Sequence, residues 1–392
     1  MSKRIHHLSP LALLALTACG GGGGGGSSSG SSSSGGSGSS GSSSYSILGK
    51  VIKGPLTNAL VFLDYNDNGT FDAGETSVRT ASDGSYTLTS SQASVSIVAL
   101  TDDTTIDSSS GSVLTGVTLR APSGASVVSP NTTLMKEAGL TAAEVGEVLG
   151  LSADIDITTF NPYATGVDAA KALAVEKVSQ QIMTTISTFA AVTEGSGASA
   201  EDSFSTALAS VVEVVQQKAV AFKSDPSVKL DLSSTTDLAS IKSSVTTKAA
   251  SVSGVDQTAL ATISNDTATA IKNVNAKIDT VTDLTSDDSK NVFSTTQVLS
   301  EQVETAAKTE AAGGSGSIEF VNTAKIDSAA ANATPTDISL SASTISENAG
   351  SLIIGSFSTT DDQKSGGFTY RLARVEGTDH SAFNLNTATG QL

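Results

Sequence analysis

The sequence predicts a multidomain α+β protein with an N-terminal β-sandwich, a central α-helical bundle and an incomplete C-terminal β-sandwich. Residues 46–127 alternate apolar and polar side chains in short runs, which is the period of strands. Residues 128–312 instead repeat apolar side chains every three or four positions, which is the period of helices. Alternation returns after residue 335. With 392 residues, the chain is long enough for two or three separate cores.

Residues 1–18 have the features of a secretory signal peptide. Lys3 and Arg4 form a basic start, and the apolar run LSPLALLALTA that follows is too short to span a bilayer. The run ends at the chain's single cysteine, in the sequence LTAC, which resembles the bacterial lipobox. The resemblance implies that Cys19 is acylated after cleavage, and Gly20 behind it favours the outer membrane. The alternative is an ordinary signal peptide with an incidental cysteine.

Residues 19–45 consist almost entirely of glycine and serine after the cysteine. Such a segment is a flexible coil, with a root-mean-square span of roughly 25–30 Å for about 25 residues. We therefore expect a tether that holds the folded part away from a membrane.

Residues 46–127 predict short strands separated by Gly, Asn, Asp and Ser turns, as in a sandwich. Asp83-Gly84 is a typical hairpin turn signal. The predicted strands lie in the segments SILGKVIKG, ALVFLDY, SVRTASDGSYTLTS, VSIVALT and SVLTGVTLRAP.

Residues 128–312 predict helices. Thr141 and Glu144 have the spacing of a capping box ahead of a short helix. Longer helices are predicted for VDAAKALAVEKVSQQIMTTISTFAAV, for residues 199–222, for the stretch around Ile271 and for the stretch around Val298. Their apolar stripes are most simply explained by core packing.

Residues 313–334 are expected to be a linker, because they open with GGSGS. Residues 335–392 return to alternating strands and stop at Leu392 in the middle of the pattern. Half a sandwich leaves an unpaired edge. We therefore expect the chain to be a fragment of a longer protein.

The composition argues against several functions. The net charge is -17, which disfavours nucleic acid as a partner and suits hard divalent cations. After removal of the signal peptide, His380 is the only histidine and no free thiol remains, so zinc clusters and His-based nucleophilic sites are poorly supplied. The chain also lacks tryptophan, which disfavours aromatic carbohydrate platforms. We expect no enzyme activity.

The segment LDYNDNGTFDAGE fits the spacing of a twelve-residue calcium loop, D-x-[DN]-x-[DN]-G-x5-E. Its flanks predict strands, so an EF-hand is not expected. Gly69 would make the sharp turn around the ion. The expected ligands are side-chain oxygens and one backbone carbonyl, from Asp64, Asn66, Asn68, Thr70 (carbonyl), Asp72 and Glu75. The alternative is a solvated acidic turn, since a turn between strands uses Asn, Asp and Gly in any case.

Residues 47–88 resemble a bacterial surface module, the prealbumin-like sandwich of the adhesin B-repeat and carboxypeptidase-regulatory type. The resemblance rests on GKV at 49–51, Gly54-Pro55, ALV at 59–61, the acidic loop and TASDGSYTL. It implies a calcium loop without flanking helices.

Residues 335–392 resemble the opening of a bacterial cadherin-like repeat, through PTDISL, SEN, FTY and the final TGQL. The resemblance implies a second candidate calcium site that includes Glu347 and Asp361. Gln363 stands where relatives often have a second aspartate, so this site has less support than the loop.

Together these patterns predict a lipid-anchored cell-surface protein for calcium-dependent cell adhesion or surface scaffolding, on the outer membrane. Calcium is the expected cofactor. The expected partners are the membrane, through the anchor, and cell-surface proteins or further copies of the chain. The alternative is a substrate-binding or accessory lipoprotein attached to a catalytic domain beyond Leu392. A third reading makes the helical region a periplasmic partner-binding or sensory module.

Overall fold

The computed structural model of this chain describes residues 44–331, 337–342, 344, 353–360, 370, 383–386 and 390–392. This part of the chain contains eight α-helices, one short 3-10 helix and several small β-sheets. The α+β class predicted from the sequence is therefore confirmed. Cys19, Glu347, Asp361 and His380 lie outside the described residues.

Most strands precede the helices, as the sequence predicts. The strands are β1 (Tyr45–Val51), β2 (Leu56–Thr57), β3 (Leu60–Asp64), β4 (Ser77–Arg79), β5 (Ser85–Ser90), β6 (Ser96–Leu100), β7 (Ile106–Asp107), β8 (Ser112–Val113), β9 (Thr118–Ala121), β10 (Val127–Val128), β11 (Asp337–Leu340) and β12 (Phe357–Thr360). One sheet has the order β4-β3-β6-β9, a second has β10-β1-β5, and a third has β2-β7-β8. All pairs within them are antiparallel except β1 with β10.

The first two sheets share one core. Strand β5 buries alternate residues, Tyr86 and Leu88 among them, and β3 and β6 bury Val61 and Ile97. All four belong to one cluster of buried apolar side chains. Period-two alternation thus corresponds to one buried face for β5, whereas β3 and β6 bury consecutive residues and are covered on both faces.

The hairpin expected at Asp83-Gly84 is wrong. The segment does turn tightly, and Gly84 has a φ of 75°. However, β4 pairs with β3 while β5 pairs with β1, so the turn carries the chain from one sheet to the other. A side chain at Gly84 would meet the Val51 carbonyl oxygen, which explains the glycine without a hairpin.

The helices begin at polar caps. They are α1 (Pro130–Ala138), α2 (Ala142–Val148), α3 (Ala169–Gly195), α4 (Ala200–Phe222), α5 (Thr235–Ala249), α6 (Gln257–Asp279), α7 (Asp287–Ala311) and α8 (Thr323–Ala330), with the 3-10 helix η1 at Glu319–Val321. A Ser, Thr, Asp or Asn side chain caps the N-terminus of each α-helix. The capping box of Thr141 and Glu144 is confirmed at α2.

Helix α3 is the centre of the bundle and packs against α4, α6 and α7. It buries Ile182, Ile186 and Phe189, as its apolar spacing predicts. It also buries threonines, most of whose hydroxyls donate to carbonyls four residues earlier, although the Thr188 hydroxyl has no partner among the described residues. Thr184 donates to the carbonyl of Gln180 at 2.9 Å, and its hydroxyl lies 2.7 Å from that of Thr296 on α7.

The predicted linker at 313–334 contains a helix in the structure. Ile318, Phe320 and Ile326 are buried, and α8 packs against α7 and α6. The GGSGS start concealed this amphipathic segment, because three apolar residues at spacings of two and six give only a weak periodic pattern.

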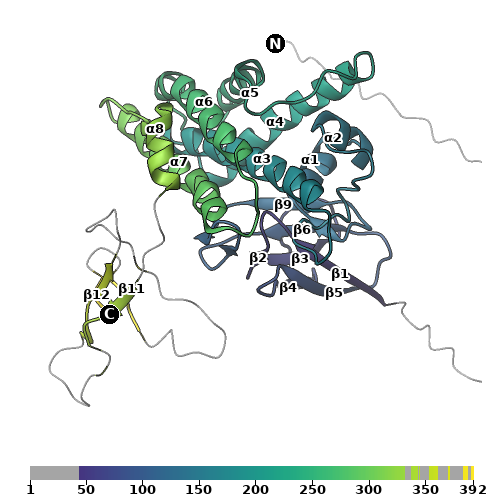
Figure 1. The fold of residues 1–392 in the computed structure, drawn as a ribbon, viewed down its shortest axis with the longest axis horizontal. Coiled ribbons are helices and arrows are strands. Elements are labelled where there is room, and N and C mark those ends of the chain that lie inside the picture. The colour runs from purple at the N-terminus through teal and green to yellow at the C-terminus, as the bar shows by residue number, and fades with distance from the viewer. Residues whose placement is uncertain are drawn as a thin grey trace, which may run out of the picture. The chain divides into compact units, whose positions relative to one another are not determined.

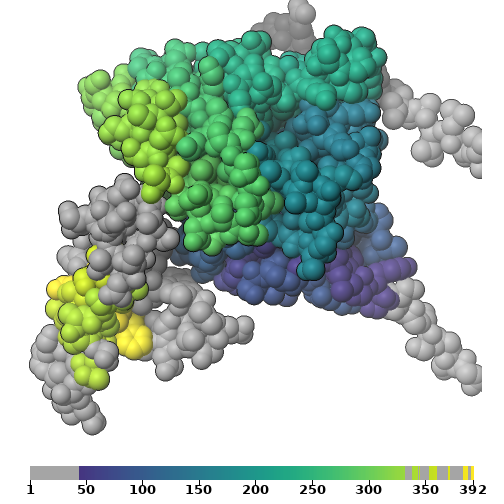
Figure 2. All heavy atoms as spheres, viewed as in Figure 1, coloured from purple at the N-terminus to yellow at the C-terminus, as the bar shows by residue number. Residues whose placement is uncertain are grey.

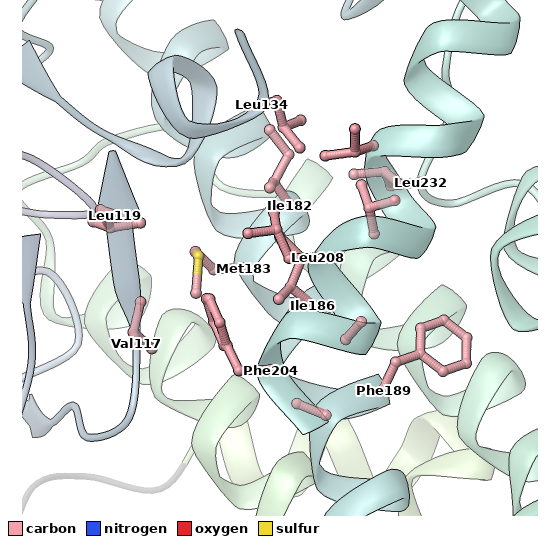
Figure 3. Packing of buried hydrophobic residues seen from close by; sticks show 14 of the residues in the cluster. Val117, Leu119, Leu134, Ile182, Met183, Ile186, Phe189, Phe204, Leu208 and Leu232 are labelled. Carbon is pink, nitrogen blue, oxygen red and sulfur yellow. The ribbon is translucent and has the colours of Figure 1, made fainter. Parts of the chain in front are cut away.

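The strands and helices between residues 44 and 331 lie against one another (Figures 1 and 2), and both contribute to one cluster of buried apolar side chains. Helix α1 lies on β9, where the Thr133 hydroxyl accepts from the backbone N–H of Arg120 at 2.9 Å and the Thr132 hydroxyl donates to its carbonyl at 2.9 Å. Met183 and Phe204 point from the helices toward the strand that carries Leu119 (Figure 3). The β part is therefore packed directly against the helices.

In the C-terminal segment, β11 and β12 form an antiparallel pair with Leu340 opposite Phe357. The Phe357 ring stacks on Tyr370 with centroids 5.3 Å apart. The structure therefore contains strands where alternation predicts them. The cadherin-like assignment stays a prediction.

Candidate calcium loop and buried polar junction

The acidic loop joins two strands. Asp64 is the last residue of β3, Glu75 precedes β4, and β3 and β4 are antiparallel neighbours. The structure thus confirms that the loop lies outside an EF-hand. All six predicted ligand residues fall on this one connection.

Asp64 anchors the beginning of the loop. Its side chain is nearly buried, with an exposed fraction of 3%. One carboxylate oxygen accepts from the backbone N–H of Asn68 at 3.1 Å, and the other accepts from Gly69 at 2.6 Å. These two bonds fold the chain back over the carboxylate within five residues.

Three further predicted ligands converge on one another. The side-chain amides of Asn66 and Asn68 both donate to the same oxygen of Asp72, at 2.9 and 2.8 Å. These bonds lower the pKa of the Asp72 carboxyl below its usual value. The Asn68 side-chain oxygen accepts from the backbone N–H of Thr70 at 2.7 Å.

Glu75 closes the loop. Its two carboxylate oxygens accept from the backbone N–H groups of Tyr65 and Asp72, each at 3.0 Å. Because Tyr65 lies at the beginning of the loop and Asp72 near its end, the Glu75 side chain holds the two limbs together.

Two residues in the turn have left-handed backbones, Asp67 with a φ of 60° and Gly69 with 76°. Asp67 also pairs with Lys136 of α1 at 2.8 Å, and this pairing lowers the pKa of its carboxyl. Arg120 of β9 lies directly against Gly69, where an added Cβ would lie 1.7 Å from a guanidinium nitrogen. The loop is therefore fastened to both β9 and α1.

The donor set of the loop fits calcium. Carboxylates, amide oxygens and a carbonyl are the hard oxygen ligands that Ca²⁺ takes, and softer ligands are missing from the loop. One oxygen of Asp72 already accepts two hydrogen bonds from side-chain amides. A bound cation would stabilise the negative charge of this carboxylate in their place. A half-turn of each Asn amide would present oxygen in place of nitrogen, and it would break the bonds that these oxygens now accept from the backbone N–H groups of Asn68 and Thr70. Asp64, Asn66, Asn68, Thr70, Asp72 and Glu75 would hold the ion.

Elsewhere in the described part of the chain, no three His, Cys, Asp or Glu side chains gather as a metal-binding group. The three carboxylates of the loop, from Asp64, Asp72 and Glu75, do not gather as such a group either. The candidacy of the loop rests on the convergence described above.

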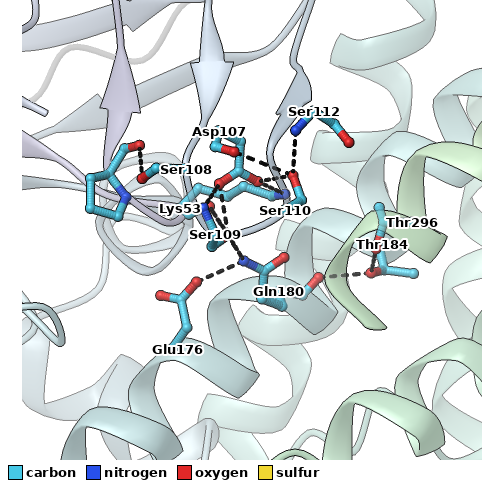
Figure 4. Close-up of polar contacts among 11 residues, drawn as sticks. Lys53, Asp107, Ser108, Ser109, Ser110, Ser112, Glu176, Gln180, Thr184 and Thr296 are labelled. Carbon is cyan, nitrogen blue, oxygen red and sulfur yellow. Dashed lines mark hydrogen bonds and ion pairs between the residues drawn. The ribbon is translucent and has the colours of Figure 1, made fainter. Parts of the chain in front are cut away.

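A second unusual site lies where β2 and β7 meet α3. Lys53 and Asp107 form an ion pair at 2.6 Å, with side-chain exposed fractions of only 4% and 1% (Figure 4). Asp107 also accepts from the hydroxyls of Ser109 at 2.7 Å and Ser110 at 3.0 Å. The buried charges are thus paired and hydrogen-bonded, as burial requires.

Helix α3 joins this cluster through Gln180 and Glu176. The Gln180 amide nitrogen donates to the Ser109 hydroxyl at 2.9 Å and to Glu176 at 2.7 Å. Glu176 is fully buried, and desolvation raises the pKa of its carboxyl to about 7. We call Lys53, Asp107, Ser109, Glu176 and Gln180 the polar junction.

Some polar atoms of the junction lack partners among the described residues. One Glu176 carboxylate oxygen, the Gln180 side-chain oxygen and the Tyr163 hydroxyl are buried without a hydrogen bond. Burial and the carboxylates of Glu176 and Asp107 raise the pKa of Tyr163. A proton on Glu176 would supply one of the missing donors.

Sequence reasoning missed the polar junction. Lys53 and Gln180 are 127 residues apart, and their contact depends on how α3 packs on the strands. The one local signal was Glu176, a charged residue between Val175 and Val178 on the buried stripe of α3.

Comparison with protein families, with curated proteins and with solved structures gave no significant match. Within the described ranges, no helix has the length and apolar character needed to cross a membrane. The class of protein is thus defined by its own features, an α+β fold with a candidate calcium loop on its β part.

Proposed function

We propose that this chain is a lipid-anchored surface protein whose loop at residues 64–75 binds calcium, and that it serves calcium-dependent adhesion or surface scaffolding. The observation that carries the proposal is the convergence of Asn66, Asn68 and Asp72 inside a turn held by Asp64 and Glu75. Calcium there is structural, since the loop connects two strands of one sheet.

The contacts of the loop support a stiffening role. The Asp67–Lys136 pair and the packing of Arg120 on Gly69 connect the loop to α1 and β9. An ion that fixes the loop would therefore also restrain the contact between strands and helices. Extracellular calcium modules bind at about 0.1–1 mM, which suits an ion that is always present outside a cell.

Membrane attachment is proposed from the sequence alone, through Cys19. Replacing it with serine (Cys19→Ser) should move the protein from the membrane fraction to the soluble fraction of the producing cells, because the thiol that carries the lipid is gone. Retention in the membrane fraction would show that the lipobox interpretation is wrong.

Adhesion is tested with beads that carry the protein from residue 44 onward. We expect the beads to cluster with about 1 mM calcium and to disperse with a chelator. Beads carrying Glu75→Gln should cluster less at the same calcium concentration. Equal clustering with calcium and with chelator, and equal clustering of wild-type and Glu75→Gln beads, would argue against the proposed function. Glu347 and Asp361 are proposed as a second site, by the same resemblance as above.

A further inference from the structure

A cavity of about 360 Å³ lies between the strands and the helices, on the side of β7 and β8. Its wall comes from the β8–β9 connection and from α3, α4 and α7. The volume is within the usual range for small-molecule sites, which concentrate at junctions of this kind. The calcium loop does not line it, so the cavity is independent of the function proposed above.

The inner wall of the cavity is apolar. Phe204 of α4 and Phe293 of α7 are buried there, together with Val117, Ala190 and Ala191. Phe293 is only 1% exposed, so the apolar surface that a bound hydrocarbon or aromatic body can cover comes from Phe204 and the half-buried Leu114.

The charged residues of the wall are mostly acidic. The positive charge of Lys53 is neutralised by its ion pair with Asp107. Glu194, Glu301 and Glu304 complete the charged lining, and Lys308 outside it pairs with Glu304. The lining therefore favours a cation over an anion.

Glu194 is the carboxylate without a partner. It is half-buried, and its carboxylate forms no hydrogen bond or ion pair within the described part of the chain, although its backbone carbonyl accepts from the N–H of Gly197 at 2.9 Å. Burial and the neighbouring Glu304 raise the pKa of its carboxyl more than the nearby Lys308 lowers it, so its negative charge is only partly compensated. An ammonium group placed beside Glu194 would supply the missing charge and up to three hydrogen-bond donors.

We propose that this cavity binds a small primary amine with an apolar body, its ammonium group against Glu194 and its body against Phe204 and Leu114. The apolar wall favours ligands with an apolar body, and the carboxylate of Glu194 favours ligands with a positive charge. An anion of the same shape would be repelled by the glutamates, and a neutral analogue would leave Glu194 without an ion pair.

Three ligands of similar shape test the proposal on the chain from residue 44 onward: 2-phenylethylamine, 2-phenylethanol and 3-phenylpropionate, titrated by ligand-observed NMR. We expect the amine to bind with a dissociation constant on the order of 0.1–1 mM, given its few heavy atoms. The alcohol should bind at least about tenfold more weakly, because it loses a charge-assisted hydrogen bond. The carboxylate should not bind. Equal binding of all three ligands, or of none, would overturn the proposal.

Two variants locate the site. Glu194→Gln should reduce amine affinity to that of the alcohol, while Glu147→Gln on the exposed face of α2 should leave it unchanged. Ser187→Phe places a large side chain in the cavity from a half-buried position of α3 and should abolish binding of amine and alcohol alike. Unchanged amine binding by either Glu194→Gln or Ser187→Phe would show that the amine binds elsewhere.

Discussion

Replacing Glu176 with glutamine should remove a pH dependence from the stability of this protein. Glu176 is fully buried in the polar junction, and its pKa is raised from 4.5 to about 7. Glutamine keeps the shape and the contact with Gln180 but cannot ionise. The junction otherwise presents Lys53, Asp107 and Tyr163 to this position, and all three remain in the variant.

The sign follows from proton binding. Between pH 4.5 and about 7 the folded protein holds a proton on Glu176 that the unfolded chain has released. The stability of the wild type therefore falls as pH rises through this range and changes no further above it. Each pKa unit corresponds to about 1.4 kcal/mol, so the whole loss is about 3 kcal/mol.

The assay is urea unfolding of both proteins at several pH values. At about pH 8, Glu176→Gln should be more stable than the wild type by up to about 3 kcal/mol, and the difference should shrink toward zero near pH 4.5. Subtracting the two curves removes the titration of every other group. Glu147→Gln, exposed on α2, should show no pH-dependent difference. A difference between Glu176→Gln and wild type that is the same at every pH would refute the reasoning.

Two further predictions concern single contacts. Asp107→Asn removes the carboxylate that pairs with the buried Lys53 ammonium at 2.6 Å and should lower the free energy of unfolding by about 3–5 kcal/mol in urea titrations at about pH 5, where Glu176 is protonated, whereas a loss below about 1 kcal/mol would contradict a buried pair. Gly69→Ala should cost about 1–2 kcal/mol from its left-handed φ, plus the displacement of Arg120. Gly111→Ala is the control, because Gly111 has a similar φ of 72° but open space around it. If both substitutions lower the free energy of unfolding equally, the Arg120 contact adds nothing to the cost of Gly69→Ala.

Local patterns predicted the elements of this fold well. The alternation around Leu88 corresponds to one buried face of β5, whereas α3 is buried on all sides around Ile182, so its apolar spacing predicted a helix but not its full burial. Helix α1 lies inside the region predicted to be helical, but no separate helix was predicted there, because its residues, PNTTLMKEA, are mostly polar and it buries threonines through hydrogen bonds. Its start was nevertheless marked, since Ser129 caps it and Pro130 occupies the first turn.

The candidate site was partly predictable for a physical reason. The ligands of the loop lie within twelve residues, so their spacing alone indicates that they can converge. The anchoring of Asp67 by Lys136 joins residues 69 apart, and the junction between Lys53 and Gln180 joins residues 127 apart. Contacts of that kind are fixed by how α1 and α3 pack on the strands, which a periodic pattern does not contain.

The central claim is that the loop binds calcium and that the ion stabilises the fold. The most direct test is the melting temperature of the chain from residue 44 onward, in about 1 mM calcium and in a chelator, for the wild type and for Glu75→Gln. A site with a dissociation constant of about 0.1 mM gives roughly 1.4 kcal/mol of stabilisation, or a rise of about 2 °C for a folded region of this length. We predict this rise for the wild type and its loss in Glu75→Gln. Equal melting temperatures of the wild type with calcium and with chelator would contradict the account.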